Sequence, residues 1–235
     1  MQRSFYLFLG ALFLTTAIAS AAPCNQLTDE EKAAGWKLLF DGKTTQGWHA
    51  FKQTSMPGHT WVVEDEWLHC LGKPGDDILS EAEFEQFDLQ WEWKMKPGGN
   101  SGVKYFVLET RNHVVGHEYQ IVDDETEPDG KKPKHVTASF YDVLAPTVKT
   151  PMKPMGELNQ SRILVQGNHV EHWLNGVKVL EYECGSEAVK AAVAQSKFRT
   201  TPGFGDRVKA HILLQAHGGS IWFRNIKIRD LAQSK

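Results

Sequence analysis

Two polar side chains within an otherwise apolar run are the first candidates for chemistry in this sequence. Glu118 and Gln120 lie in residues 117–122, and Asp123 follows at the end of the run. Alternate residues of a β-strand share one face, so Glu118 and Gln120 are expected to project together. Polar groups on a buried face need hydrogen-bond partners, which a bound ligand can supply. On an open sheet surface the same residues would be ordinary polar exterior, and the pattern alone leaves both interpretations standing.

Other strand-like segments add polar groups of different kinds. These are Gln215 and His217, which share a face, then Lys104 and His172. Carboxylate, amide, imidazole and ammonium groups together offer the donors and acceptors that sugar hydroxyls need. A carbohydrate site lined by these strands is therefore one interpretation, although a single histidine among ten is more commonly a surface or core residue.

The sequence lacks the spacings of several established catalytic and metal-binding motifs. It contains no His-Glu-x-x-His, no EF-hand loop, no Walker loop and no Gly-x-Ser-x-Gly elbow. Asp123-Asp124-Glu125 supplies oxygen ligands of the kind that calcium prefers, but acidic runs are commonly solvated loops. We expect no cofactor, with calcium at this run as the alternative.

Charge and cysteine content narrow the possible partners. The formal net charge of -3 provides no basic stripe for DNA or RNA, so nucleic acid is not an expected partner. Cys24, Cys70 and Cys184 allow at most one disulfide, and the sequence does not choose the pair. No C-x-x-C spacing occurs, which argues against a structural zinc site.

The first residues have the layout of a cleavable signal peptide. Arg3 precedes the apolar run of residues 5–18, and small residues follow. The run is too short for a comfortable membrane span. We expect residues 1–21 to be removed and the rest to be exported, to the periplasm or the extracellular space, without a transmembrane segment. A lipid anchor on Cys24 and a buried N-terminal helix are the alternatives.

Helical signals are confined to two short segments. Thr28 and Glu31 have the capping-box spacing, which predicts a short helix within the N-terminal segment, residues 22–34. Ser186 is the expected N-cap of a second helix in residues 186–195.

The rest of the chain is predicted to form short strands separated by turns. The predicted strands are residues 36–40, 61–63, 67–69, 87–94, 102–108, 117–122, 161–166, 169–174, 177–182, 211–215 and 220–229. Asn175-Gly176 is the clearest hairpin turn, since both residues tolerate the positive φ that a tight turn needs. Many short strands without βαβ alternation predict an all-β fold of two packed antiparallel sheets with short peripheral helices, in one domain over residues 35–231.

The eight tryptophans suggest either stacking platforms for sugar rings or core residues. Those that lie in apolar strands are expected in the core: Trp36, Trp61, Trp67, Trp91, Trp93, Trp173 and Trp222. Trp48 fits either interpretation.

A series of short motifs runs along the chain in a defined order. They are Leu38-Leu39-Phe40-Asp41-Gly42 with Gly47-Trp48, Gly99-Asn100-Ser101-Gly102, Gly116-His117-Glu118-Tyr119-Gln120, His172-Trp173-Leu174-Asn175-Gly176, Leu214-Gln215-Ala216-His217-Gly218 and Phe223-Arg224-Asn225-Ile226. Their order and spacing resemble the 3-keto-disaccharide hydrolase family, from about Gly35 to Leu231.

That resemblance implies a concanavalin A-like jelly-roll sandwich and an enzyme that cleaves glycosides already oxidised to a ketone at C3. The ketone acidifies the C2 proton, a base removes it, and the C1 substituent leaves by β-elimination. Water can then add to the 3-keto-2-hydroxyglucal, so the family is also described as a 3-keto-glucoside 1,2-lyase and hydratase. This chemistry needs a base near C2, donors to the developing enolate and an acid for the leaving oxygen.

Mapped onto this sequence, the resemblance implies a set of site residues. The candidate catalytic residues are Glu118, His172, His217 and Lys104, and the candidate substrate-binding residues are Asn100, Gln120, Asp123, Gln215 and Arg224. Glu118 or His172 is the expected base, with His217 as the acid. The expected donors to the enolate are Lys104 and Gln120.

Two other functions fit the same residues. A non-catalytic, lectin-like carbohydrate-binding module can use the same fold. An ordinary glycoside hydrolase would need a second carboxylate beside Glu118, and Glu92 and Asp123 are the candidates. Three proton-transfer groups on one face, Glu118, His172 and His217, favour an enzyme over a lectin.

Overall fold

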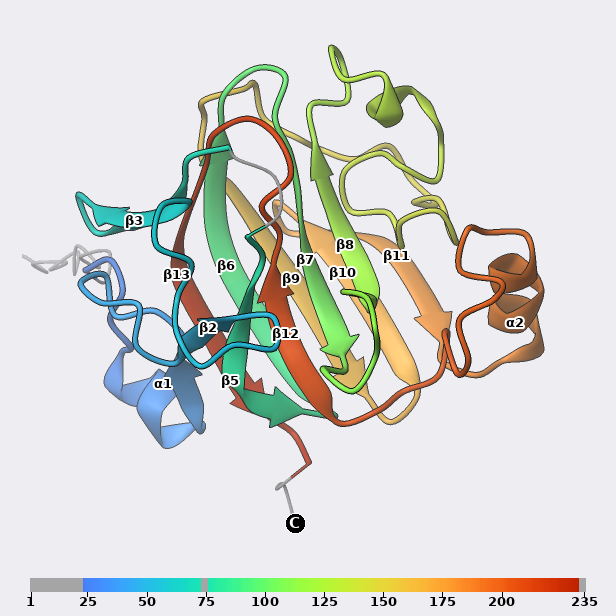
Figure 1. Cartoon of the computed structure of the whole chain (residues 1–235), viewed down its shortest axis with the longest axis horizontal. Coiled ribbons are helices and arrows are strands. Elements are labelled where there is room, and N and C mark those ends of the chain that lie inside the picture. The colour runs from blue at the N-terminus through green and yellow to red at the C-terminus, as the bar shows by residue number, and fades with distance from the viewer. Residues whose placement is uncertain (1–22, 73–75, 233–235) are drawn as a thin grey trace, which may run out of the picture.

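Two antiparallel sheets pack face to face in the computed structural model, which describes residues 23–72 and 76–232 (Figure 1). Within these residues the larger sheet has eight strands: in spatial order β11 (Val177–Glu183), β10 (His169–Leu174), β9 (Asn159–Gln166), β6 (Phe87–Met95), β13 (Ile221–Asp230), β4 (Trp67–Cys70) and β3 (Trp61–Glu64), with β1 (Trp36–Leu38) paired to β13. The smaller sheet has five: β2 (Trp48–Ala50), β5 (Ile78–Phe84), β12 (Ala210–Leu214), β7 (Asn100–Val107) and β8 (His117–Val122). The predicted all-β jelly-roll sandwich is confirmed. The expected signal peptide, residues 1–21, lies outside the described residues.

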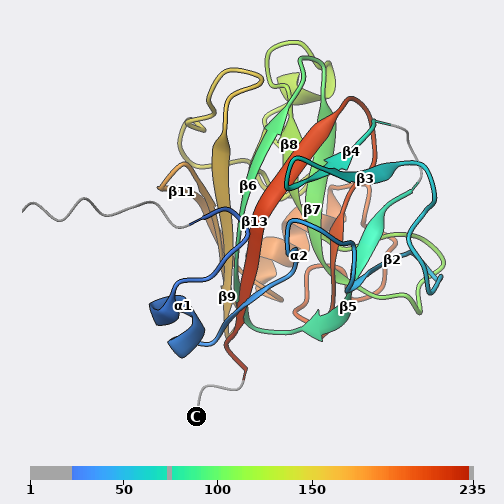
Figure 2. The same cartoon turned by 90° about the vertical axis from the view of Figure 1, so that its left-hand side faces the viewer.

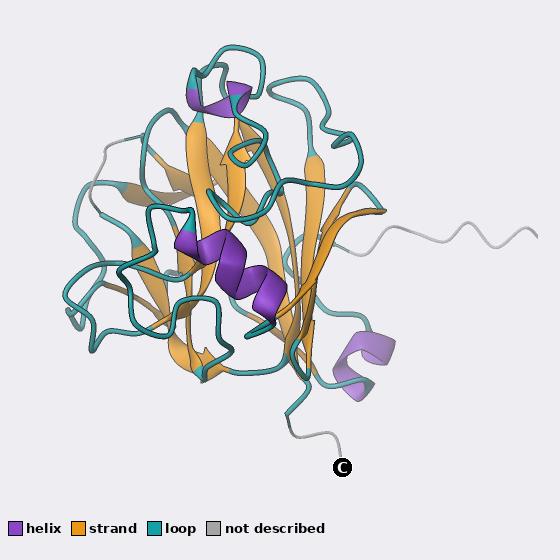
Figure 3. Cartoon of the chain, turned by 90° about the vertical axis from the view of Figure 1, so that its right-hand side faces the viewer, coloured by secondary structure: helices purple, strands orange, loops and turns teal. Residues whose placement is uncertain are grey.

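Both predicted helices form, each with the expected cap. In α1 (Asp29–Ala33), the Thr28 hydroxyl accepts from Glu31 N at 3.2 Å, and the Glu31 carboxylate accepts from Thr28 N at 3.0 Å. Ser186 caps α2 (Glu187–Ala194) by accepting from Val189 N at 3.2 Å. Figure 3 shows α2 lying across one side of the sandwich, the side on which β8 and β11 form the edges of their sheets. A short 3₁₀ helix, η1 (Asp129–Lys131), lies in the connection from β8 to β9.

The predicted hairpin joins β10 to β11, with Asn175 at φ 48° and Gly176 at φ 81°. Two strands escaped prediction, the short β2 and the longer β5. In β5, three buried residues from Ile78 precede three exposed ones that end at Glu83, so the strand shows no period-two pattern.

Aromatic and aliphatic side chains from both sheets fill the space between them. Trp91 and Trp93 of β6 are buried as predicted, and the Tyr119 ring of β8 packs edge-on against Trp91. The Tyr119 hydroxyl lies 2.9 Å from Ser161 Oγ on β9, which links the two sheets by a hydrogen bond. Tyr119 therefore marks the inner face of β8.

The tryptophan prediction is wrong at four positions on the outer face of the larger sheet. Trp61 and Trp48 are buried, but Trp36, Trp67, Trp173 and Trp222 are only partly buried. Cationic side chains cover some of these rings: the guanidinium of Arg224 lies 4.4 Å from the Trp67 ring centroid, and the ammonium of Lys94 lies 4.5 Å from it. Such cation–π contacts stabilise an aromatic ring on a polar sheet face. A tryptophan in a strand can therefore lie outside the core, and its place in the strand does not show which face it is on.

A buried polar network crosses the core between the sheets. The Tyr105 hydroxyl lies 2.8 Å from His172 Nε2 and 2.6 Å from the Tyr182 hydroxyl, which lies 2.9 Å from His117 Nδ1. His172 Nδ1 lies 2.9 Å from Ala138 O, so both ring nitrogens of this histidine have partners. His172 is 0% exposed, and burial lowers its pKa to about 4 and that of His117 to about 3.

All three cysteines are free, and Cys70 and Cys184 are buried. Burial raises the pKa of the Cys70 thiol to about 11. Across residues 23–72 and 76–232, neither α-helix has the length and apolar character needed to cross a bilayer.

Replacing His172 by glutamine is expected to weaken the loss of stability in acid. A histidine in the unfolded chain titrates near pH 6.5, whereas burial holds the folded-state pKa of His172 at about 4. Between these values the unfolded chain binds a proton that the folded chain does not, so stability is complete above pH 6.5 and falls as the pH falls. His172→Gln removes this titration. Below pH 6.5, the free energy of unfolding of the variant should therefore approach that of the wild type by roughly 1 kcal/mol for each pH unit. Denaturant titration at a series of pH values measures both free energies. A difference between them that stays constant with pH would contradict this role of His172.

Candidate active site

The outer face of the smaller sheet carries a cavity of about 270 Å³. Since Tyr119 points between the sheets, its neighbours Glu118 and Gln120 point outward into this cavity. The cavity brings together these predicted site residues: Asn100, Lys104, Glu118, Gln120, Gln215 and His217. They come from β7, β8 and the end of β12, which are adjacent in the sheet.

A shielded ion pair lies at this cavity. Lys104 stands directly opposite Glu118 across β7 and β8, and Lys104 Nζ lies 3.6 Å from Glu118 Oε2. Their side chains are only 10% and 6% exposed. Desolvation offsets much of the attraction in such a pair, so stability alone is a weak explanation for keeping it. An ammonium beside a carboxylate can instead stabilise a developing negative charge and accept a proton.

Gly102 makes room for the carboxylate of Glu118. A Cβ atom at Gly102 would lie 2.7 Å from Glu118 Oε1, closer than real Cβ contacts allow. Gly102, the last residue of the Gly99-Asn100-Ser101-Gly102 motif, therefore leaves the space that the Glu118 carboxylate occupies.

Two amide side chains offer complementary groups to a ligand. Gln120 Oε1 accepts from Ile121 N at 3.2 Å, which leaves the Gln120 amide N–H groups free to donate. Gln215 Oε1 is buried and has no hydrogen-bond partner within the described part of the chain. A buried acceptor without a donor costs free energy, which a ligand hydroxyl would recover. The cavity therefore presents at least one donor and one acceptor from amides.

Loops complete the cavity wall with residues that the sequence analysis missed. Val114 and Val115 belong to the β7–β8 connection, and Tyr141 and Lys197 come from two other connections. The ammonium of Lys197 lies 4.1 Å from the Tyr141 ring centroid, and burial lowers the pKa of Lys197. The Tyr141 hydroxyl donates to Asp129 Oδ2 at 2.8 Å. No strand pattern marks these residues, because the path of a loop is not encoded in period-two alternation.

Asp77 is a further acidic group close to these residues. Its carboxylate accepts from Ala216 N at 2.8 Å, between Gln215 and His217 in sequence. Burial raises the pKa of Asp77, against the opposing effect of the Lys104 ammonium. A partly buried carboxyl that is easier to protonate than usual therefore lies close to the Lys104–Glu118 pair.

Three predicted site residues do not line the cavity. His172 is enclosed between the sheets, and Arg224 lies on the larger sheet, where Nε donates to Glu92 Oε2 at 2.8 Å. Asp123 accepts hydrogen bonds from Gly98 N at 2.9 Å and Glu125 N at 3.0 Å, so it fastens a turn. Burial alone would raise the pKa of Asp123, but these hydrogen bonds hold it below its ordinary value. His172 is therefore removed as the candidate base, and Arg224 as a hydroxyl-positioning residue.

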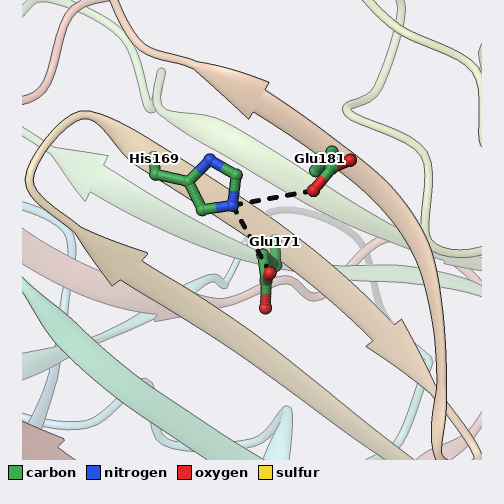
Figure 4. A group of neighbouring side chains, drawn as sticks. All are labelled: His169, Glu171 and Glu181. Atoms are coloured by element: carbon green, nitrogen blue, oxygen red, sulfur yellow. Dashed lines mark hydrogen bonds and ion pairs between the residues drawn. The ribbon is translucent and has the colours of Figure 1, made fainter.

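Within the described ranges, one group brings three possible metal ligands together, and it lies on the larger sheet. Figure 4 shows His169, Glu171 and Glu181, with His169 Nε2 3.4 Å from Glu171 Oε1 and 3.7 Å from Glu181 Oε2. The Lys178 ammonium contacts both carboxylates, at 3.2 Å and 2.5 Å. A lysine already provides the positive charge there, so these residues fit an ion-pair network better than a metal site.

The acidic run considered for calcium is also engaged internally. Asp123 is held as described above, and Asp124 Oδ1 accepts from Thr137 N at 2.8 Å. Burial raises the pKa of Asp124 to about 6, the opposite of what a carboxylate poised for a cation would show.

Comparison with known proteins gives consistent matches. Residues 35–229 match the family described as the 3-keto-alpha-glucoside-1,2-lyase-like domain. The 3-keto-disaccharide hydrolase of Bacteroides thetaiotaomicron is 31% identical over an alignment of 244 positions, which covers 90% of this chain and 83% of that protein.

Two solved structures from Parabacteroides distasonis, provisionally assigned as glycosyl hydrolases, are also similar. One has a TM-score of 0.81 and 35% identity, covering 89% of this chain and 100% of that one. The other has a TM-score of 0.68 and 30% identity, covering 83% and 99%.

Gly102→Ala is expected to displace the Glu118 carboxylate without unfolding the protein. The nearest atom is the end of a side chain that can turn away, but Cγ and Cδ of Glu118 would also lie 3.2 and 3.3 Å from the new Cβ, so we expect a loss in stability of about 1–3 kcal/mol. The measurements are the crystal structure and the thermal midpoint. Gly58→Ala is the matched control, because its added Cβ would meet nothing within 4 Å. A Glu118 carboxylate still paired with Lys104 in the Gly102→Ala crystal would show that this glycine does not define its position.

Proposed function

Because the chain belongs to the 3-keto-alpha-glucoside-1,2-lyase-like family, we propose that it cleaves 3-keto-glycosides, such as 3-keto-disaccharides, by removing the C2 proton and eliminating the C1 substituent. The chain is an enzyme of a carbohydrate-hydrolysing family. The 3-keto-glycoside substrate and the individual steps of the reaction are what we propose.

The observation that carries the proposal is the Lys104–Glu118 pair, whose charged atoms lie 3.6 Å apart at the cavity. In the substrate, the ketone oxygen and C2 are both bonded to C3 and lie about 2.4 Å apart by ordinary bond lengths. An ammonium and a carboxylate at this spacing can contact the ketone oxygen and the C2 proton at the same time. Lys104 would hold the ketone oxygen and stabilise its developing charge, while Glu118 takes the proton from C2.

The other cavity residues fit the remaining steps. The free Gln120 N–H groups provide a second donor to the enolate, and Gln215 Oε1 accepts from a sugar hydroxyl. His217 protonates the C1 oxygen as the C1–O bond breaks and the C1–C2 double bond forms. Water then adds its hydroxyl at C1 and a proton at C2, and the net result is hydrolysis. Asn100 is a further hydroxyl-positioning residue.

The proposed reaction needs no cofactor. The ketone already acidifies the C2 proton, and the Lys104 ammonium supplies the positive charge that the enolate needs. We also propose export to the periplasm or the extracellular space, on the signal-peptide layout of residues 1–21.

An ordinary two-carboxylate glycoside hydrolase is the second candidate, on the strength of Asp77. The predicted partners of Glu118 do not serve: Glu92 is paired with Arg224 on the other sheet, and Asp123 fastens a turn. Asp77, however, is a partly buried carboxyl with a raised pKa near the Glu118 carboxylate, and glycosidases pair such an acid with an ionised carboxylate. That mechanism would act on an unoxidised glycoside.

Incubation with a 3-keto-disaccharide beside its unoxidised parent separates these functions. The proposal predicts release of free sugar from the 3-keto compound and none from the parent, followed by chromatography over time. Cleavage of the parent alone would establish the two-carboxylate reaction instead. Binding of either compound without turnover would identify a carbohydrate-binding module.

The controls for this experiment are Glu118→Gln and a chelator. Loss of a general base typically costs about 10²- to 10⁴-fold in rate, so Glu118→Gln should lose turnover to that extent and keep its thermal midpoint. Chelator treatment of the wild type should leave the rate unchanged. Unchanged turnover in Glu118→Gln would remove Glu118 as the base.

A further inference from the structure

A second and larger cavity, of about 380 Å³, lies on the outer face of the larger sheet. Its wall is shared by β6, β9, β10, β13 and the chain that precedes β1. Figure 2 shows α1 and the N-terminal segment on the outer side of this sheet, whereas β7 and β8 lie in the other layer. The cavity is therefore on the opposite side of the sandwich from Glu118.

The N-terminal wall of this cavity is fastened to the sheet. Asn225 N donates to Asn25 Oδ1 at 2.8 Å, and Asn25 Nδ2 donates to Glu66 O at 2.8 Å. Farther along, the Lys227 ammonium pairs with the Glu31 carboxylate. These contacts tie the segment to β13 and the β3–β4 turn, so the cavity is formed before any ligand arrives.

A tryptophan ring is held in place on the opposite wall. Trp173 is only partly buried, and its indole N–H donates to Glu171 Oε2 at 2.8 Å. The Arg162 guanidinium lies 5.6 Å from the ring centroid. An amphipathic ring with a fixed orientation is a suitable surface for the C–H face of a sugar.

The ionic groups around this cavity already have counterions within the protein. Arg162 binds Asp88 through two hydrogen bonds, of 2.7 Å and 2.9 Å, and Glu92 pairs with Arg224 at 2.8 Å. Lys227 is paired with Glu31. Each charged side chain named on the wall therefore already has a counterion and does not need a charged ligand. The chemistry of the wall thus favours a neutral polar ligand over an anion or a cation.

Two amides supply the directional contacts that such a ligand needs. Gln160 Nε2 donates to Glu92 Oε1 at 3.1 Å, and Gln90 Nε2 lies 3.4 Å from Asp88 Oδ1. Within the described part of the chain, neither amide oxygen accepts a hydrogen bond. Each amide therefore offers an acceptor, held by its own nitrogen contact, to a ligand that carries hydroxyl groups.

We propose that this cavity is a second carbohydrate-binding site, which takes a neutral hexopyranose unit with its C–H face on Trp173 and its hydroxyls on Gln90 and Gln160. The site is separate from the Lys104–Glu118 cavity and performs no chemistry. It would hold the enzyme on a larger saccharide, and it does not depend on which bond the enzyme cleaves.

The test uses Glu118→Gln protein labelled with ¹⁵N in its tryptophans, titrated with maltotriose and with cellotriose. The Trp173 indole resonance, assigned with Trp173→Phe, should shift with at least one of these neutral probes, with a dissociation constant on the order of 1 mM. Calorimetry should then show at least a tenfold loss of affinity in Trp173→Ala. Gln160→Ala, an exposed position that should not disturb folding, should weaken binding several-fold.

The matched control is Trp67→Ala, a partly buried tryptophan of the same sheet whose ring is covered by Arg224 and Lys94 and which lies outside the cavity. Its affinity should equal that of the parent protein, and Trp173→Ala should keep wild-type turnover on small substrates. If neither probe causes a saturable shift of the Trp173 indole resonance, the proposal is overturned. So would affinity that survives both Trp173→Ala and Gln160→Ala.

Discussion

The register of β7 against β8 decides which side chains line the cavity on the outer face of the smaller sheet. In this register Lys104 stands opposite Glu118, and Gly102 stands opposite Gln120. Side chains alternate between the two faces of a strand, so a slip of one residue would turn Glu118 into the core and Tyr119 out of it. An unpaired carboxylate buried in the core would cost about 3–5 kcal/mol, which strongly favours the observed register. The same constraint that keeps the core apolar thus aims the carboxylate at the cavity.

Histidines have different roles between the sheets and on the outer face of the smaller sheet. His117 of β8 and His172 of β10 are enclosed between the two sheets, hydrogen-bonded to Tyr182 and Tyr105, and remain neutral because burial lowers their pKa. They fix the sheets against each other. His217 lies exposed at the edge of the cavity on the outer face, where both solvent and a ligand can reach it.

Much of the fold could be predicted from local patterns, because caps, tight turns and alternation act over a few residues. The Thr28–Glu31 capping box and the Asn175-Gly176 hairpin formed as expected. Alternation also showed which polar residues share a strand face, but not which face meets the core, and His172 was misplaced for that reason. Tyr141 and Lys197 reach the cavity from loops, whose paths depend on tertiary contacts such as the bond from Tyr141 to Asp129.

The most direct test of the central claim, that Glu118 removes the C2 proton, is hydrolysis of a 3-keto-disaccharide in D₂O. Elimination followed by addition of D₂O places deuterium at C2 of the released 3-keto sugar, which mass spectrometry and proton NMR detect at early times. The same sugar incubated without enzyme measures spontaneous exchange. The account predicts one deuterium at C2 for each turnover, above that background. Product that keeps its original C2 proton would contradict the account and indicate direct displacement at C1.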